Sequence, residues 1–360
     1  FPIELLNRDL ALTSSIEDIS DNGEGVVGQF AGRVNQFRFT LQDSMLQARL
    51  VRRYGVKNTG MGKNADQIIE RSNTPGIFQS YKILAYTPDK KAVVVDMTEL
   101  FLESSRLTNP FPSYAGNSLY GFVQRIHKFQ SQRSELLGIC GNDNSMSVHC
   151  NLGFNVDRLV LGSFMQAKDV PVSVTVNKIL MLLPEDPMRP RLADSRIGVN
   201  AIIQTELPDV CQGIKTYYIT KRWRIEPVDE IRYKQGEMVD VKKPIVFYID
   251  TLMPDSWIKY VKAGAEAWNA AFEKIGLRNV VRTELFPKDS SFDAGDIHNS
   301  VIRYAPSWMY YPQYSMHTDP RTGEILNASV YLPANVASYF YTSRTEETMA
   351  VDPSVRKARL

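Results

Sequence analysis

The feature that most constrains the fold is a run of prolines near the middle of the sequence. Pro184, Pro187 and Pro190 lie within seven residues, and each lacks the backbone N–H that a helix interior or a central strand requires. The run therefore predicts a crossing between domains. We expect three regions: a β-rich N-terminal domain over residues 1–183, a proline-containing connection with strands over 184–243, and a further domain over 244–360.

The first region is patterned as strands. Residues 77–86 and 92–95 are rich in apolar and β-branched side chains, and the Thr-Pro-Asp-Lys sequence that separates them is typical of a turn. Val172, Val174 and Val176 alternate with polar residues, which is the period of a sheet with one buried face. Both patterns predict a β-rich domain.

The last region combines short strands with one long helix. Residues 245–249 form an apolar run typical of a buried strand. Over 254–276 apolar residues recur every three or four positions, which predicts a helix with Trp257, Trp268 and Phe272 in the core. Three further segments are predicted as strand, turn and strand: 300–304, 319–323 and 324–332. The predicted fold class is therefore α+β.

Charge and hydropathy exclude several classes of protein. The chain has 42 basic and 40 acidic side chains, without the basic excess of a nucleic-acid-binding protein. Its longest apolar stretch, residues 170–184, contains four polar side chains and is too short and too polar to span a membrane. The first residue is Phe and not Met, which predicts that an upstream segment has been cut away or left out; a signal peptide and a lipid-anchor segment are the two candidates, and targeting cannot be read directly. No pattern indicates an oligomeric state.

The three cysteines, Cys140, Cys150 and Cys211, match no zinc or redox motif. Free thiols are the favoured interpretation because cysteine is commonly buried, and a Cys140–Cys150 disulfide is the alternative.

Most catalytic motifs are absent from the sequence, including Gly-x-Ser-x-Gly and the phosphate-binding glycine loops. No two of the four histidines are three or four residues apart, so no helix can present a paired-imidazole zinc site. We therefore predict no metal and no cofactor within these residues. We interpret His317 as a solvated loop residue, and Asp293, Asp296 and His298 as part of a plain acidic loop and not a calcium site.

Six sequence blocks occur in the same order as in large secreted bacterial zinc-dependent metalloproteases of the metzincin type, and the chain resembles this family. The blocks are 187–198, 222–227, 243–250, the helix 254–276, 300–304 and 319–326. The resemblance weakens upstream of Pro184.

The resemblance implies an N-terminal domain of undefined role, followed by the sheet and long helix that open a metzincin catalytic domain. The family's zinc ligands and catalytic glutamate lie on a later His-Glu-x-x-His helix, and the chain stops before such a helix. Zinc is thus expected only in the complete protein, and this chain alone is predicted to be inactive. An extracytoplasmic location and a protein or peptide substrate are implied as well.

The resemblance also assigns a substrate-binding segment. It implies that Ala328, Ser329, Val330, Tyr331 and Leu332 form the edge strand of the sheet, where a peptide adds through main-chain hydrogen bonds. No side chain is assigned a catalytic role. The family tends to have an aromatic, His, Asn segment after 324–326, and this chain instead has 330–335 without a histidine. The alternative function is a non-catalytic extracytoplasmic module that binds a protein or a glycan.

Overall fold

The chain forms two compact units that are interleaved in sequence. The computed structural model describes residues 1–21, 23–30, 34–51, 56–58, 67, 71, 74–103, 107–111, 116–118, 121–142, 144–160, 164–207, 215–288, 292–306 and 312–351. Unit 1 comprises Phe1–Ser20, Phe30–Arg224 and His317–Leu326, and unit 2 comprises Asp21–Gln29, Ile225–Met316 and Asn327–Leu360. The main division thus falls at residues 224 and 225, inside the region predicted as a connection.

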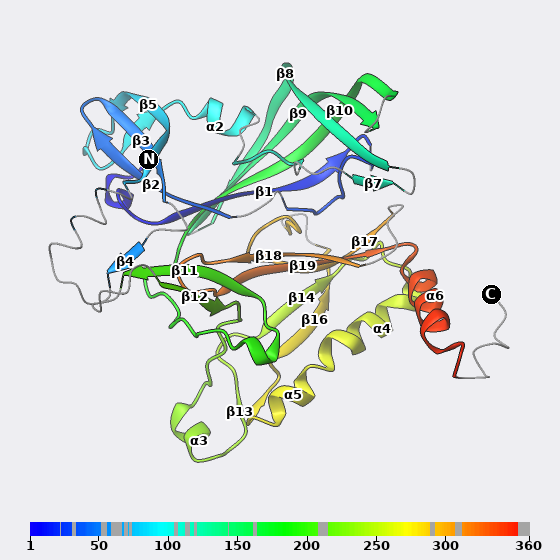
Figure 1. Ribbon diagram of the computed structural model, residues 1–360. Helices are drawn as coiled ribbons and strands as arrows, with labels where there is room; N and C mark the ends of the chain where they lie inside the picture. The colour runs from blue at the N-terminus through cyan, green and yellow to red at the C-terminus, as the bar shows by residue number, and fades with distance from the viewer. Residues whose placement is uncertain are drawn as a thin grey trace. The chain divides into compact units, whose positions relative to one another are not determined.

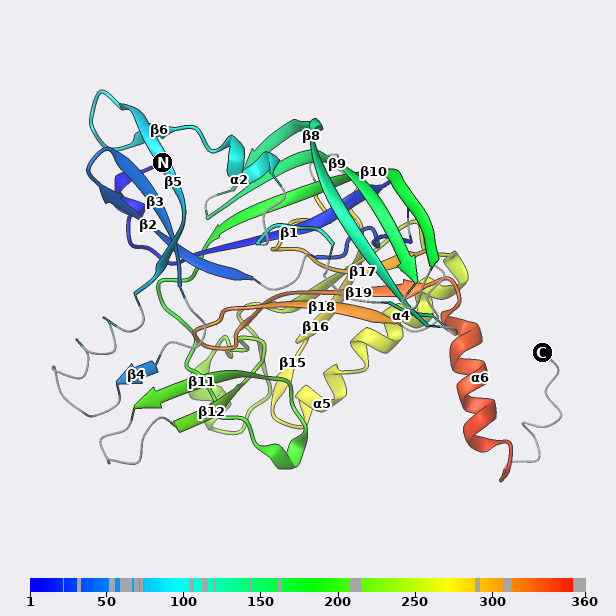
Figure 2. The same cartoon turned by 45° about the horizontal axis from the view of Figure 1, so that its top comes forward.

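Unit 1 is built on an antiparallel sheet of nine strands in the order β6-β5-β3-β2-β1-β10-β9-β8-β7. Its strands are β1 (Leu10–Ile19), β2 (Asn35–Gln42), β3 (Met45–Leu50), β5 (Gly76–Tyr86), β6 (Val93–Val95), β7 (Gly116–Ser118), β8 (Gly121–Gly141), β9 (Ser145–Val160) and β10 (Phe164–Leu182). The sheet curls strongly along its length (Figures 1 and 2). The prediction of a β-rich N-terminal part is therefore confirmed, including the β5–β6 hairpin.

The core of unit 1 lies on one face of this sheet. Val172, Val174 and Val176 of β10 are at most 1% exposed, as their alternation with polar residues predicted. Phe37 and Phe39 of β2 belong to the same cluster and pack edge to face. The short helix α2 (Thr98–Leu102) adds apolar side chains to it.

Smaller elements complete unit 1. The strands β4 (Val56–Asn58), β11 (Ala201–Leu207) and β12 (Lys215–Thr220) form a sheet in the order β12-β11-β4, and two 3-10 turns lie at Ile3–Leu5 and Ser195–Ile197. The predicted crossing at 184–191 contains neither a helix nor a strand. Cys140 and Cys150 are free thiols, as predicted, and Cys211 lies outside the described residues.

Unit 2 contains a five-stranded mixed sheet in the order β16-β14-β17-β19-β18. Its strands are β14 (Ile245–Ile249), β16 (Val281–Leu285), β17 (Ser300–Ala305), β18 (Gln313–Thr318) and β19 (Ile325–Pro333). β14 is parallel to β16 and β17, and β17 is parallel to β19. A tight turn joins β18 to β19, so β18 runs in the opposite direction. Further elements are α3 (Glu230–Lys234), β13 (Val239–Asp240), β15 (Leu277–Arg278) and α6 (Val336–Thr348).

The predicted long helix is present but interrupted. It consists of α4 (Asp255–Glu266) and α5 (Asn269–Glu273), and Gly276 follows it with a φ of 83°. Trp257 packs edge to face on Tyr304 of β17, so this helix covers one face of the sheet. Trp268 is 66% exposed, which makes its predicted core position wrong. Trp268 lies in the turn between α4 and α5, and the apolar cluster that Trp257, Val261 and Ala265 form against the sheet does not include it.

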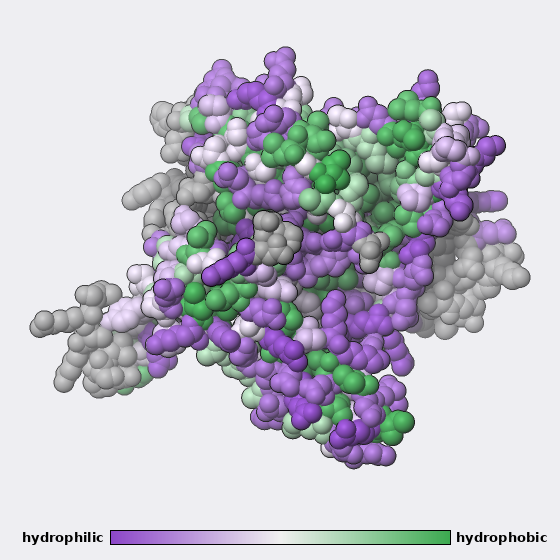
Figure 3. All heavy atoms as spheres, turned by 180° about the vertical axis from the view of Figure 1, so that it is seen from behind, coloured by the Kyte–Doolittle hydropathy of each residue, from purple (hydrophilic) through white to green (hydrophobic). Residues whose placement is uncertain are grey.

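The surface mixes hydrophilic and apolar groups, as the face drawn in Figure 3 shows. Some apolar side chains are at least half exposed, among them Leu136 and Ile139 of β8. Among the described residues, no helix combines the length and the hydropathy that crossing a membrane requires.

Candidate functional site

The predicted substrate-binding segment lies in the interior of the mixed sheet and not at its edge. Ala328, Ser329, Val330, Tyr331 and Leu332 belong to β19, which has β17 on one side and β18 on the other. The predicted edge position is therefore wrong. The turn after β18 folds that strand back against β19, and the main-chain groups of β19 are used for pairing on both sides.

The strand at this edge of the sheet is β18. It ends the strand order in the described part of the chain, so one row of its N–H and C=O groups faces away from the sheet. Tyr314 of β18 is 63% exposed. An extended peptide can pair with such a row, and a large exposed side chain beside it offers apolar contact.

A buried tyrosine supports β18 from the neighbouring strand. The hydroxyl of Tyr331 lies 3.1 Å from the hydroxyl of Ser315 on β18 and donates a hydrogen bond to the carbonyl of Gly28. Burial raises the pKa of Tyr331, so the phenol keeps its proton and remains a donor. The side chain is 3% exposed, and its contacts tie β19, β18 and the segment before Phe30 together within unit 2.

The contact between Tyr331 and the Gly28 carbonyl occurs where glycine suits the backbone. The φ of Gly28 is 84°, and a Cβ atom there would lie 2.6 Å from Cδ of Arg303 on β17. Glycine adopts this backbone conformation without strain, and a larger residue there would have to displace the Arg303 side chain. The chain at Gly28 is therefore held against β17 and β19.

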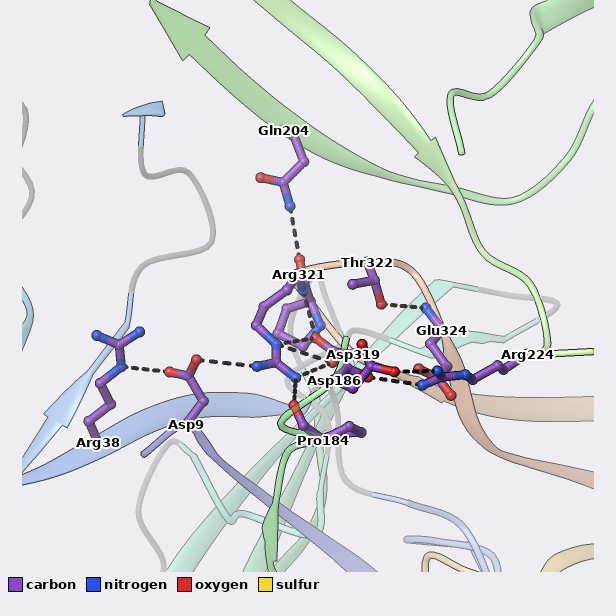
Figure 4. Close-up of polar contacts among 11 residues, drawn as sticks. Asp9, Arg38, Pro184, Asp186, Gln204, Arg224, Asp319, Arg321, Thr322 and Glu324 are labelled. Atoms are coloured by element: carbon purple, nitrogen blue, oxygen red, sulfur yellow. Dashed lines mark hydrogen bonds and ion pairs between the residues drawn. The ribbon is translucent and has the colours of Figure 1, made fainter. Parts of the chain in front are cut away.

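The turn that joins β18 to β19 contains a buried ion pair. Asp319 is completely buried, and its carboxylate accepts hydrogen bonds from the backbone and the guanidinium of Arg321, at 2.7 to 3.1 Å. Figure 4 shows that Arg321 also points toward Asp9 and the carbonyl of Pro184. Its Nη1 lies 3.5 Å from Oδ2 of Asp9, and its Nη2 donates to the Pro184 carbonyl at 2.9 Å.

The charges in this network stabilise each other. Burial alone would raise the pKa of Asp9, but hydrogen bonds from Arg38 and Gln36 and the charge of Arg321 outweigh it and lower the pKa. Burial alone would lower the pKa of Arg321, and the hydrogen bonds and charge of Asp319 outweigh it and raise the pKa. The Asp9 carboxylate and the Arg321 guanidinium therefore stay ionised, and we regard them as structural groups and not as proton-transfer groups.

Two further segments of unit 1 hold the same turn. Gln204 on β11 donates from Nε2 to the carbonyl of Pro320 at 2.8 Å. Arg222 donates its backbone N–H to the carbonyl of Gly323 at 3.0 Å, and its own carbonyl accepts from Ile325 at 2.8 Å. A Cβ atom on Gly323 would lie 2.5 Å from the carbonyl oxygen of Thr220, so this approach requires glycine.

His317 and His298 have different environments. His317, predicted as a solvated loop residue, is 2% exposed at the end of β18, and this prediction is wrong. Its ring packs on Phe30 at 4.2 Å, and neither ring nitrogen has a hydrogen-bond partner among the described residues. Burial lowers the pKa of His317 to about 3. His298 lies in a loop, where its Nδ1 is 2.8 Å from the carboxylate of Asp296.

A further histidine meets a glutamate on the sheet of unit 1. Nδ1 of His149 on β9 lies 2.9 and 3.0 Å from the two carboxylate oxygens of Glu17. Glu17 is the extra residue of a β-bulge between Ile16 and Asp18, and such bulges redirect side chains. No sequence pattern indicated this pair, because the two residues are 132 positions apart.

The donor set does not fit a zinc ion in either unit taken alone. Among the described residues of each unit, no three His, Cys, Asp or Glu side chains converge as ligands, and structural and catalytic zinc sites use three or four protein ligands. We therefore assign no step of zinc chemistry to these residues. What the arrangement offers is a strand edge with buried polar groups behind it.

The comparisons with known proteins identify one family. Residues 28–228 match DUF5117, a domain of unknown function. A search of curated proteins found no match, and neither did a search of solved structures. Because the family match covers more than half of the chain, the protein belongs to the DUF5117 family.

Proposed function

We propose that this chain is the N-terminal portion of a zinc-dependent endopeptidase, in which the edge strand β18 holds the substrate peptide. The observation that carries the proposal is the mixed sheet of unit 2, with a long helix on one face and one antiparallel strand at an edge. This arrangement agrees with the sheet and helix that the metzincin resemblance implies. The six ordered sequence blocks support the same assignment.

The edge strand suits a peptide of any sequence. Main-chain hydrogen bonds provide affinity without selecting side chains, and neighbouring pockets add specificity. Tyr314 is the exposed large side chain of β18 and is the candidate for contact with a substrate side chain. The peptide bond would then be cleaved by water activated on a zinc ion. We assign the ligands of that ion to none of the residues described above.

The test compares the 360-residue chain with the entire product of its gene. We expect the entire product to hold one zinc ion per molecule by plasma-emission analysis and to cleave casein. The 360-residue chain should hold no stoichiometric zinc and cleave nothing, because zinc-activated water needs three protein ligands and a general base.

Two results would contradict the proposal. One is an entire gene product that holds no zinc and cleaves no protein, which would favour the non-catalytic module that binds a protein or a glycan. The other is tight stoichiometric zinc in the 360-residue chain, which would place the metal site among residues to which we assign none.

A further inference from the structure

The turn between β18 and β19 is held more firmly than an ordinary hairpin turn. Connections of this kind usually run over the surface, yet Asp319 is completely buried and Thr322 is 3% exposed. Four residues from separate segments of unit 1 hold the turn, and we call them the turn anchor: Asp9, Pro184, Gln204 and Arg222.

Three members of the turn anchor lie inside the DUF5117 match at 28–228: Pro184, Gln204 and Arg222. Arg38, the ion-pair partner of Asp9, lies inside the match as well. The turn itself lies about ninety residues beyond the end of that match. The family domain therefore contacts a segment that is remote from it in sequence.

The turn anchor can act on the sheet edge through the chain itself. His317 and Thr318, the last two residues of β18, belong to unit 1 together with the turn. Ile325 and Leu326, the first two residues of β19, belong to unit 1 as well. Fixing the turn therefore fixes one end of each strand, and no further contact is needed to transmit the effect.

An edge strand needs such support. It is hydrogen-bonded on one side only, and elements with few buried contacts open locally at low free-energy cost. A frayed strand presents no regular row of donors and acceptors to a peptide. A rigid turn at its end reduces this fraying.

We propose that the DUF5117 region is a positioning domain: through the turn anchor and Arg321 it holds β18 extended and in register, ready to pair with a peptide. The benefit to peptide binding rests on the function proposed above. The positioning itself can be measured without any peptide or zinc.

The test is hydrogen exchange of the 360-residue chain, read by mass spectrometry, for Arg321→Gln and wild type. Arg321→Gln removes the charged hydrogen bonds to Asp9, Asp319 and the Pro184 carbonyl. We expect exchange across Gln313–Thr318 to accelerate by at least about tenfold, the factor that corresponds to losing one charge-assisted hydrogen bond. β14 and β17 of the same sheet should exchange as in wild type.

A matched pair of variants provides the control. Asp9 pairs with Arg38 at 2.6 Å and is 13% exposed, and Asp157 pairs with Lys128 at 2.6 Å and is 12% exposed. Asp9→Asn and Asp157→Asn thus remove similar ion pairs from unit 1, but only Asp9 contacts the turn. Faster exchange in β18 is expected for Asp9→Asn and not for Asp157→Asn.

The proposal is overturned if β18 exchanges at the wild-type rate in Arg321→Gln, or if all strands of the sheet accelerate equally, which is the result of a merely structural role. Should Arg321→Gln fail to fold, Gln204→Ala removes a single hydrogen bond to the turn and is read in the same way. Faster exchange in β18, combined with a wild type that binds no peptide, would retain the positioning role and reject the proposed function.

Discussion

The buried His317 makes a quantitative prediction about acid stability. Burial lowers the pKa of its imidazole from 6.5 to about 3. As the pH falls below about 6.5, the unfolded chain binds a proton at this residue and the folded chain does not, so the free energy of unfolding decreases. At pH 4.5, two units below the unfolded pKa, the loss is about 2.7 kcal/mol. This magnitude requires only that the folded pKa lie well below 4.5.

The assay is urea unfolding, followed by circular dichroism, of wild type, His317→Gln and His317→Leu at pH 7.5 and pH 4.5. Other groups also titrate over this range, so the quantity of interest is the difference from wild type. Both variants should lose about 2.7 kcal/mol less than wild type between the two pH values. At pH 7.5, His317→Leu should be more stable than His317→Gln by about 1–3 kcal/mol, because only glutamine leaves buried polar atoms unsatisfied. Equal pH dependence in all three proteins would refute the reasoning.

Two other substitutions test the packing of unit 1 and the glycine at the turn. Gly323→Ala should lower the free energy of unfolding by at least about 2 kcal/mol more than Gly236→Ala. Both glycines have positive φ, but only Gly323 has a carbonyl oxygen within 3 Å of the new Cβ. Equal losses of the two variants in urea unfolding would contradict this. Lys178 is fully buried, and desolvation lowers its pKa to about 8. The unfolded chain therefore binds the proton more tightly than the folded chain, and the wild-type free energy of unfolding should rise by about 2 kcal/mol from pH 7.5 to pH 10. Lys178→Met should abolish this rise, and a rise that persists in the variant would place its origin elsewhere.

Elements with a local signal could be predicted from the sequence. The alternation at 172–176 and the turn at 87–90 depend on residues adjacent in sequence, and the strand and the turn are both present as expected. The helix over 254–276 was also indicated by its own spacing. Its interruption before α5 was not, because that spacing continues across the break.

Features that depend on remote partners could not be predicted. Whether β19 lies inside the sheet or at its edge depends on the return of β18, and apolar spacing within β19 is the same in either case. Asp9 and Arg321 are 312 residues apart, and nothing near either residue indicates the other. His317 packs on Phe30, which is also far from it in sequence.

The most direct test of the account is whether a peptide pairs with β18. The 360-residue chain is incubated with millimolar casein-derived peptides, and amide exchange is followed in both edge strands of the mixed sheet. We predict protection across Gln313–Thr318 and none across Val281–Leu285 of β16, the opposite edge, which serves as the internal control. Unchanged exchange in β18, or equal protection of the two edges, would contradict the assignment of β18 as the peptide-binding strand.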